Sequence, residues 1–412
     1  MLEVRFVVPA SAQRLRSCVF GDYLDEFFSS LIELGYRAAS VRHKLWVLSD
    51  LAHWMANVHL GLAELDERRV EEYIDLRRRR GRTCRGFRST GLLLIEQLRC
   101  AGVIPRPEVP LDNSSEGALL RRYEVYLRQE RALAQSTISR YLTVARELIA
   151  QSIGAGRCPE VLSAGAIRDF LLARVRRVAP RPAQLMGSAL RSFLRFLFLR
   201  AETGLDLSLA IPTVRQWRLS NVPRYLPSPV VERLLRACDL GSSTGRRNHA
   251  ILLLLARLGL RAREVVDLEL GDLNWRIGEI VVHGKGLVSD RLPLLPEVGD
   301  ALALYLQKDR PSSSSRRVFL RCRAPHRGLG NASSVSTIVM RALGRAGLTS
   351  TARGAHLLRH SLATLMVRRG ASFTEVGQVL RHRSPRTTEI YAKLDFDSLS
   401  AVAMPWPTHG GA

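Results

Sequence analysis

Six side chains in the last third of the chain have the types, and follow the order, that attack on a phosphate ester requires. They are Arg261, Lys285, His356, Arg359, His382 and Tyr391. Transfer of a phosphoryl group without a metal needs cations on the non-bridging oxygens, an acid for the leaving oxygen and a nucleophile in line with the bond that breaks. The set contains a candidate for each role, so this region predicts a site for phosphoryl transfer.

Arg261 and Lys285 lie in segments that can present a cation to a ligand. In RLGLRAREVVDLEL, Arg261 stands at the expected start of a helix, after a turn at Gly259, where its guanidinium would add to the positive end of the helix dipole. Lys285 stands between two glycines at the tip of an expected hairpin, where a flexible ammonium group can protonate a leaving oxygen. Considered separately, each also fits an ordinary solvated side chain, although lysine occurs only four times in the chain.

The remaining four candidates lie in two segments close to the C-terminus. AHLLRHSLATLMVRRG carries His356, Arg359 and His360 at spacings of three and four, which place them on one face near the start of a helix. His and Arg side chains so placed can hydrogen-bond phosphate oxygens. LRHRSPRTTEIYAKL adds His382 and, nine residues later, Tyr391. A phenol has an ordinary pKa of about 10, so Tyr391 needs nearby cations to act as a nucleophile; without them it would be a packing residue on a short helix.

A fold of mixed helices and strands must position these residues. Residues 278–295 contain a β-branched strand, a Gly-Lys-Gly turn and a second strand, which predicts a hairpin, and residues 316–322 predict a third strand. Apolar periodicity predicts helices around them, at residues 230–238, 248–258, 264–270, 296–308, 336–346, 357–369 and 373–380.

The first half of the chain predicts two helical bundles. Apolar stripes in residues 39–55 and 136–150 match at an offset of 97 residues, and so do stripes in segments 65–76 and 162–173. Either the bundle is duplicated or two amphipathic bundles look alike. Stretches rich in Pro, Ser and Asn mark linkers. The expected organisation is an extra N-terminal helical domain at 1–104, a linker at 105–117, a helical domain at 118–205, a linker at 206–225 and a catalytic domain at 226–412.

Charge favours a polyanionic partner. Lys and Arg number 62 against 38 Asp and Glu, which gives a formal net charge of +24. The excess fits nucleic acid better than a membrane surface or the ribosome. The longest apolar runs are interrupted by arginine and too short to cross a bilayer, the N-terminus lacks the order of a secretion signal, and the six cysteines show no metal spacing. We therefore expect a cytoplasmic protein, associated with the nucleoid when bound to DNA.

The segments that carry the candidate residues resemble those of a known family, the tyrosine recombinases or phage integrases. The resemblance rests on GLRAREVVDLELGDL, on GKG before RLPLL, and on HLLRHSLATLMVRRGASFTEVGQVLRHRSPRTTEIYAKL, and it spans residues 226–394. The second bundle resembles the family's core DNA-binding domain, which has a SAM-like fold. The resemblance implies a multidomain protein with all-α N-terminal DNA-binding domains, followed by a mixed α+β catalytic domain with a small antiparallel sheet.

The family also implies a role for each candidate. Arg261 and Arg359 would clamp the scissile phosphate, and His356 would support the transition state and assist proton transfer. Lys285 would be the general acid for the leaving 5′-oxygen, and His382 would hydrogen-bond the phosphate. Tyr391 would attack to form a 3′-phosphotyrosine link, and no metal or nucleotide cofactor would be required. Expected partners are double-stranded DNA, further copies in a synaptic tetramer, and other recombinases.

Two departures from the family pattern leave alternatives open. The family commonly has glycine before the second histidine, where this chain has Arg381, which could alter the loop or add a phosphate contact. The extra region 1–104 could bind accessory DNA, extend the clamp on the core site or bind a partner recombinase. The expected function is integration, excision or transposition of a mobile element. The alternatives are a non-catalytic DNA-binding accessory protein and a type IB topoisomerase.

Overall fold

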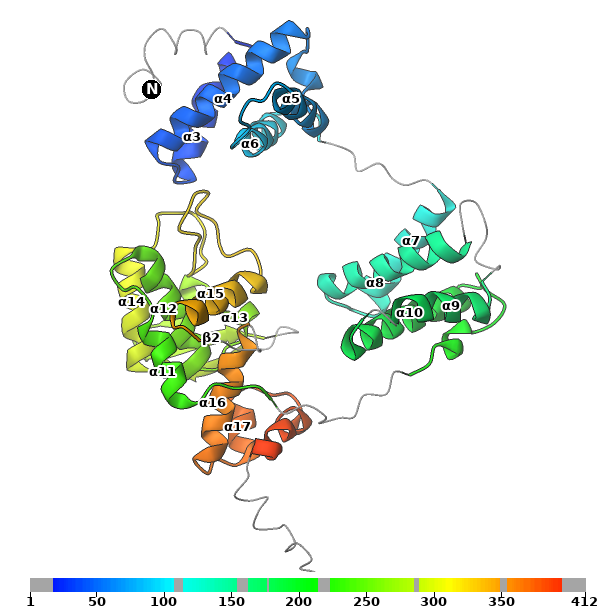
Figure 1. Ribbon diagram of the computed structural model, residues 1–412, viewed down its shortest axis with the longest axis vertical. Coiled ribbons are helices and arrows are strands. Elements are labelled where there is room, and N and C mark those ends of the chain that lie inside the picture. The colour runs from blue at the N-terminus through cyan, green and yellow to red at the C-terminus, as the bar shows by residue number, and fades with distance from the viewer. Residues whose placement is uncertain are drawn as a thin grey trace, which may run out of the picture. The chain divides into compact units, whose positions relative to one another are not determined.

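The structure is a computed structural model of the 412-residue chain. It describes residues 18–106, 114–153, 162–175, 178–213, 223–284, 289–348 and 354–394. The chain divides into two compact units, residues 1–105 together with 221–412, and residues 106–220 (Figure 1). Lys285 falls outside the described residues.

The N-terminal part of the first unit is a bundle of helices. A 3-10 turn, η1 (Gly21–Tyr23), leads into α3 (Leu24–Glu33), α4 (Ala38–Asn57), α5 (Glu67–Arg79) and α6 (Phe87–Cys100). The apolar residues of α4 recur every three or four positions, so they share one face of the helix and are buried against the other helices. The side chain of Asp66 caps α5 by accepting a hydrogen bond from the Arg69 N–H at 2.8 Å.

The second unit is a bundle of the same kind. It contains α7 (Ser115–Val125), α8 (Gln135–Leu148), α9 (Ala164–Val175) and α10 (Pro180–Leu199), with π-helical turns at Tyr126–Glu130 and Ile149–Ile153. Aromatic side chains occupy the centre of its core, where the ring centroids of Tyr123 and Phe193 lie 4.9 Å apart. In Figure 1 this bundle is coloured from cyan to green.

The two bundles match in helix position as well as in apolar pattern. Residues 38 and 135 begin α4 and α8, and residues 67 and 164 begin α5 and α9, so both pairs start 97 residues apart. Equivalent positions are buried in both, as with Val70 and Ile167. An internal duplication and the boundaries of the separate domains remain predictions.

The C-terminal part of the first unit combines helices with a small sheet. Its helices are α11 (Ser228–Arg236), α12 (Ser243–Arg257), α13 (Ala262–Asp267), α14 (Pro296–Lys308), α15 (Ala332–Arg345), α16 (His356–Arg368) and α17 (Phe373–Val379). The strands β1 (Leu273–Asn274), β2 (Glu279–His283) and β3 (Ser289–Pro293) pair in that order, and both pairings are antiparallel. The predicted fold class is confirmed, and so is the hairpin.

The prediction of a strand at residues 316–322 was wrong. That segment makes only isolated bridges, Glu269 with Arg317 and Leu320 with Gly328. Val318, Phe319 and Leu320 are buried in succession, whereas a strand at the side of a sheet would turn alternate residues to solvent. The third strand is instead β1, two residues long and adjacent to the hairpin in sequence.

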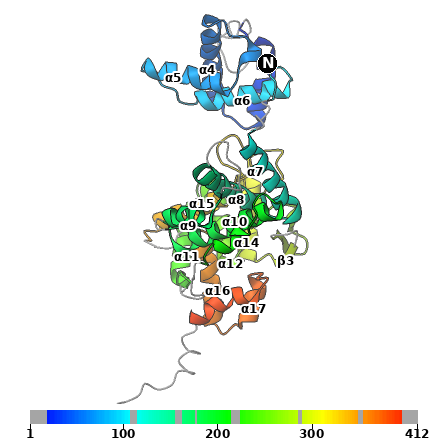
Figure 2. The same cartoon turned by 90° about the vertical axis from the view of Figure 1, so that its right-hand side faces the viewer.

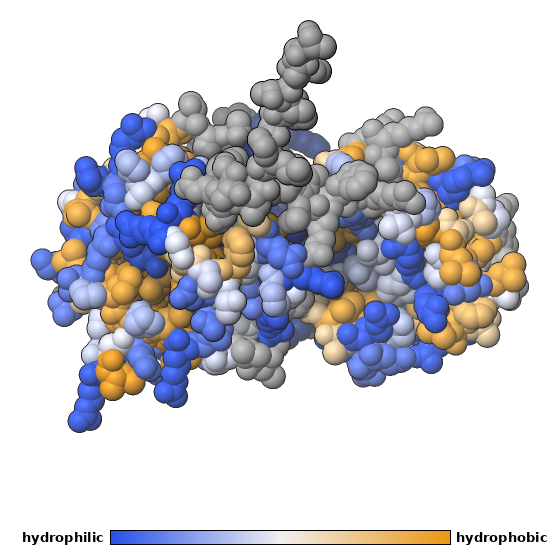
Figure 3. Space-filling view, turned by 90° about the horizontal axis from the view of Figure 1, so that it is seen from below, coloured by the Kyte–Doolittle hydropathy of each residue, from blue (hydrophilic) through white to orange (hydrophobic). Residues whose placement is uncertain are grey.

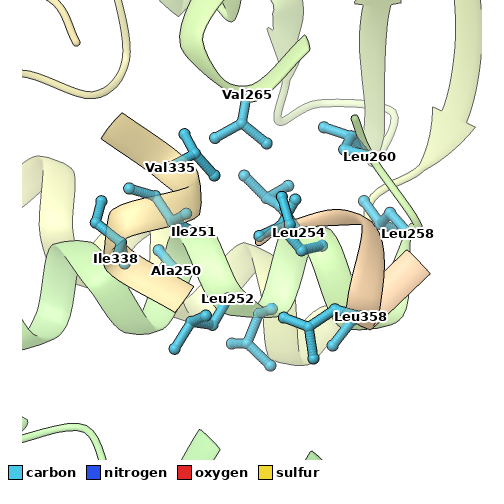
Figure 4. Close-up of a cluster of buried hydrophobic side chains, with 14 of the residues drawn as sticks. Ala250, Ile251, Leu252, Leu254, Leu258, Leu260, Val265, Val335, Ile338 and Leu358 are labelled. Carbon is cyan, nitrogen blue, oxygen red and sulfur yellow. The ribbon is translucent and has the colours of Figure 1, made fainter. Parts of the chain in front are cut away.

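A single buried helix organises this part of the chain. The second half of α12, residues 250–256, is apolar and buried on all sides, and its side chains pack against α13, α15 and α16, as Ile251, Leu254, Val265, Val335 and Leu358 illustrate (Figure 4). Figure 2 shows α16 and α17 at one end of the C-terminal part of this unit. In the described parts of the chain, none of the helices has the length and apolarity to cross a membrane. Hydrophilic and hydrophobic residues are intermixed over the face in Figure 3.

Candidate active site

Arg261 stands where the buried helix α12 turns into the short helix α13. Gly259 makes this turn with φ +59°, and a Cβ there would lie 2.7 Å from a methyl group of Leu380, so a side chain would be both strained and crowded. Arg261 is the N-cap residue of α13, and its backbone N–H donates to the Glu264 carboxylate at 2.8 Å. Its side chain is 39% exposed, which leaves part of the guanidinium open to a ligand.

Arg359 comes from the buried face of α16 and is only 4% exposed. Its guanidinium donates to two main-chain carbonyls, those of Gly259 and Leu380. Arg261 donates to the next carbonyl along the chain, that of Arg381, at 3.2 Å. Two consecutive carbonyls after α17 therefore hold the two arginines that the sequence predicted as a phosphate clamp.

The turn that presents these carbonyls depends on Arg381. This residue has φ +56°, a left-handed conformation in which glycine is unstrained and other residues pay roughly 1 kcal/mol or more. The conformation gives a physical reason for the family's glycine at this position. Here the Arg381 side chain is 5% exposed, and its Nη2 donates to the Glu264 carboxylate at 2.8 Å.

Glu264 is thus shared between two arginines, a role that the sequence did not suggest. It accepts from Arg261 Nη1 at 2.6 Å and from Arg381 at 2.8 Å. Burial alone would raise the pKa of Glu264, but the hydrogen bond from the Arg261 N–H and the charges of Arg381 and Arg261 outweigh it and hold the pKa below its ordinary value. The carboxylate therefore stays ionised and anchors both cations.

A cavity of about 860 Å³ opens beside this cluster. Its described walls include three arginines, one histidine, three threonines and two carboxylates: Arg261, Arg381, Arg383, His382, Thr374, Thr387, Thr388, Asp290 and Glu389. Cations and hydroxyl donors that face one cavity suit a phosphate group. Gly284, at the end of the hairpin strand that leads to Lys285, also lines it.

His382 follows Arg381 directly and is held by a neighbouring threonine. Its Nδ1 lies 2.7 Å from the Thr388 hydroxyl, and its backbone N–H donates to the Gly377 carbonyl at 2.8 Å. Burial, together with the charges of Arg359 and Arg261, lowers the pKa of His382 to about 4. At neutral pH the ring is therefore uncharged, and it can donate or accept a single hydrogen bond at each nitrogen.

Tyr391 lies on the short 3-10 helix η9 (Glu389–Leu394) and is 1% exposed. Its hydroxyl lies 2.7 Å from Nδ1 of His360, which the sequence placed on the same helix face as Arg359 without assigning it a role. The described walls of the cavity do not include Tyr391. The structure thus shows the tyrosine buried and in contact with a histidine, outside the described cavity walls.

The pKa values of this pair indicate where the proton resides. Burial, with smaller contributions from His356 and Arg359, lowers the pKa of His360 to about 4. Burial raises the pKa of Tyr391 to about 12, against the opposing charge of Arg359. The proton therefore stays on the phenol, whose hydroxyl donates to Nδ1 of a neutral imidazole.

The other two candidates differ in what the structure shows of them. His356 is exposed at the start of α16, and its ring centroid lies 6.3 Å from that of His360. Lys285 lies outside the described residues. Within the described residues, no group of three His, Cys, Asp or Glu side chains is arranged to hold a metal ion. The structure thus brings five of the six predicted residues to one end of the C-terminal part.

Comparisons with known proteins all point to integrases and recombinases. Residues 224–398 match the model of the phage integrase family. A Sinorhizobium fredii (strain NBRC 101917 / NGR234) protein named "Putative integrase/recombinase y4rA" is 38% identical over 387 residues, which cover 93% of this chain and 94% of that protein. Tyrosine recombinase XerC of Lactobacillus delbrueckii subsp. bulgaricus (strain ATCC BAA-365 / Lb-18) is 31% identical and covers 67% of this chain and 94% of its own.

A solved structure shares the fold of this chain. The site-specific recombinase XerH, bound to a palindromic difH substrate in a post-cleavage complex, aligns with a TM-score of 0.55 at 17% identity. That alignment covers 74% of this chain and 91% of XerH. The chain belongs to the phage integrase family, that is, to the tyrosine recombinases.

Proposed function

We propose that this chain is a site-specific DNA recombinase that cuts and rejoins DNA strands through a 3′-phosphotyrosine link at Tyr391. The main support is the pair of consecutive carbonyls, of Leu380 and Arg381, that fix Arg359 and Arg261 beside a cation-lined cavity. The segment that holds this clamp continues directly into Tyr391. Family membership makes the general recombinase reaction the natural use of such a site.

In the proposed reaction the two arginines bind the non-bridging oxygens of one phosphodiester, with His382 and His356 as further hydrogen-bond donors. The Tyr391 oxygen forms a bond to phosphorus while the bond from phosphorus to the 5′-oxygen breaks. Lys285 gives its proton to the leaving oxygen. The phosphodiester is exchanged for a phosphotyrosine ester, so a 5′-hydroxyl of a partner strand can reverse the step without an energy source.

His360 has a place in this scheme because it already accepts a hydrogen bond from the nucleophile. Its Nδ1 is the first acceptor available to the phenol proton. The negative charge of a bound phosphate raises the pKa of nearby histidines, and so makes the transfer less unfavourable than in the DNA-free protein. Attack on a phosphate in the cavity also requires Tyr391 to leave its buried position.

The proposed partner is duplex DNA, on which copies of the chain assemble into a synaptic tetramer. Exchange between two duplexes breaks four strands, and one tyrosine per strand requires four active sites. Other recombinases can supply some of these sites. The proposed location is the cytoplasm, where the protein acts on nucleoid DNA. The proposed process is the integration, excision or transposition of a mobile element.

The decisive experiment detects the covalent link. The purified protein is incubated with nicked suicide duplexes cut from the DNA that flanks its gene, and a protein–DNA adduct is sought on denaturing gels. We expect an adduct with wild-type protein, none with Tyr391→Phe, and an undiminished yield with Tyr141→Phe as a matched control. The Tyr391→Phe protein should bind the same DNA as tightly as the wild type.

Other outcomes would identify the alternatives. Binding without any adduct on every flanking duplex would indicate a non-catalytic accessory protein. Adducts on unrelated supercoiled plasmids, accompanied by relaxation, would indicate a topoisomerase. An adduct that survives Tyr391→Phe would disprove the assignment of the nucleophile.

A further inference from the structure

The arginines of the N-terminal bundle are concentrated at the turn between α5 and α6. Residues 77–88, RRRRGRTCRGFR, contain seven arginines and no acidic residue. By contrast, η1 and α3 contain only acidic charged residues, Asp22, Asp25, Glu26 and Glu33. A uniform compositional preference for arginine would not segregate the charges in this way.

Arg77 differs from the other arginines of this segment because it is buried and holds the turn in place. It is 6% exposed, forms an ion pair with Asp50 of α4, and donates from Nη2 to the Thr83 carbonyl at 3.3 Å. Its guanidinium lies over the Phe87 ring, 4.3 Å from the centroid. These contacts tie the turn to α4 and α6, so the arginines that follow are carried on an ordered frame.

Arg79, Arg80, Arg82 and Arg85 are all exposed, and among the described residues no acidic side chain forms a recorded ion pair with them. The arginines on either side of them are paired, Arg78 with Asp75 at 3.0 Å and Arg88 with Glu71. The arginines that flank the turn are thus neutralised, and four cations at the turn have no acidic partner among the described residues.

Two exposed rings of α4 adjoin these cations. The Arg85 carbonyl lies 3.0 Å from Nε2 of His43, and the His43 ring stacks on Trp46 with centroids 5.7 Å apart. Trp46 is 50% exposed, although tryptophan is usually buried over most of its surface. The indole N–H is a hydrogen-bond donor beside the arginines. We call the set of Arg79, Arg80, Arg82, Arg85, His43 and Trp46 the turn patch.

We propose that the turn patch binds the phosphate backbone of double-stranded DNA and gives the chain a DNA contact in addition to the catalytic cavity. Guanidinium groups bind phosphate in a bidentate manner, and backbone contacts of this kind position a protein without reading sequence. A lipid surface would require an apolar helix face beside the charges. The exposed residues of the turn itself are arginine, glycine and threonine.

The role left open by the sequence is thereby assigned to DNA rather than to a partner recombinase. The inference rests on the proposed function, because it takes DNA as the ligand. The test of this inference is independent of cleavage, because binding to the phosphate backbone of DNA needs neither the cognate site nor an active nucleophile.

The test measures how affinity depends on salt. Full-length protein is titrated onto a random-sequence duplex of about 60 base pairs between roughly 50 and 200 mM salt, a range over which each phosphate contact adds about 0.9 to the slope of log affinity against log salt. The variants are Arg79→Gln/Arg80→Gln, Arg82→Gln/Arg85→Gln and the quadruple substitution. We expect each double variant to lower the slope by about 1.8, and the quadruple variant by about 3.6.

A matched control separates the turn from general charge. Arg68→Gln/Arg69→Gln removes the charge of two arginines from the other end of α5, but both arginines already pair with Glu72, so the slope should fall much less. Thermal unfolding of each variant checks that the bundle remains folded.

Three results would overturn the proposal. The turn variants could keep the wild-type slope, or the control could lower it equally. Alternatively, the variants could bind DNA as the wild type does and fail only in assembly on cognate DNA, which would assign the patch to a protein partner. A wild-type protein that forms no covalent adduct, but whose slope falls in the turn variants, would refute the proposed function and leave this inference standing.

Discussion

Arginine occurs in two contrasting settings in this chain. At the proposed active site, Arg359 and Arg381 have buried side chains whose donors point at carbonyls and at Glu264. At the turn patch, arginines such as Arg79 and Arg82 are exposed and unpaired with acidic groups among the described residues. The same side chain is thus buried and hydrogen-bonded in one place and exposed to solvent in the other.

The two settings suit different contributions to function. Buried donors held in position act in a low dielectric and need no reorganisation when charge develops, so they can stabilise a transition state. Burial, with Arg261 and Arg381 nearby, lowers the pKa of Arg359 to about 10, which still leaves it charged at neutral pH. Exposed cations act by releasing counterions, so they contribute affinity that salt weakens.

The sharpest test of this contrast is the same substitution in both settings. Arg359→Lys removes the fork that reaches the carbonyls of Gly259 and Leu380, so we expect adduct formation to fall by roughly 10²- to 10³-fold, the range seen when one fixed donor is lost from a transition-state site. Arg79→Lys keeps an exposed charge and should leave DNA affinity within about twofold.

Suicide-substrate kinetics measure the first effect and anisotropy titrations the second. If both substitutions were equally mild, the clamp would not depend on guanidinium geometry. If both were severe, the turn would be a structured site rather than an electrostatic one.

The acidic partners of the arginines should also differ, in how much each contributes to the stability of the fold. Glu264→Gln leaves Arg261 and Arg381 without their shared carboxylate in a buried site, which we expect to cost about 3 kcal/mol of stability. Glu72→Gln breaks an exposed pair with Arg69 and should lower the stability much less. Thermal and denaturant unfolding of both variants tests this. Equal losses would mean that burial of Glu264 does not isolate it from solvent.

Sequence patterns predicted those parts of the structure that depend on local periodicity. The apolar stripe of α4 and the hairpin of β2 and β3 were readable because each is set by neighbours in sequence. The third strand was mispredicted, because β-branched and apolar residues at 316–322 read as a strand although they are buried in succession.

The candidate residues could be named from the sequence, but their contacts could not. Motif order suggested Arg261, Arg359 and Tyr391 because the chemistry requires those side chain types, and their catalytic roles stay a prediction. The pairing of Glu264 with Arg381 joins residues 117 positions apart, and no local pattern encodes it. His360 was visible on the helix face of Arg359, but its contact with Tyr391 depends on how the chain returns after α17.

The contact between His360 and the proposed nucleophile, Tyr391, gives a smaller predicted effect. His360→Leu removes the acceptor, and we expect adduct formation to fall by roughly tenfold to a hundredfold with DNA binding unchanged. His360→Asn keeps a hydrogen-bonding group at the same position, and should restore most of the rate if the histidine mainly orients the phenol. Equal loss in both variants would indicate that His360 acts as a base.

The smallest predicted effect is the pH dependence of stability. An unfolded histidine binds a proton below about pH 6.5, whereas folded His360, beside His356, Arg359 and Tyr391, has a pKa of about 4. Between these values the unfolded state binds more protons, so stability is lost as the pH falls from 6.5 toward 4.

His360→Asn cannot take up this proton, so its melting temperature should fall by a few degrees less than that of the wild type over the same range. Parallel melting curves for wild type and His360→Asn would show that His360 is solvated when folded. That result would remove the distinction between the buried site and the exposed patch for this residue.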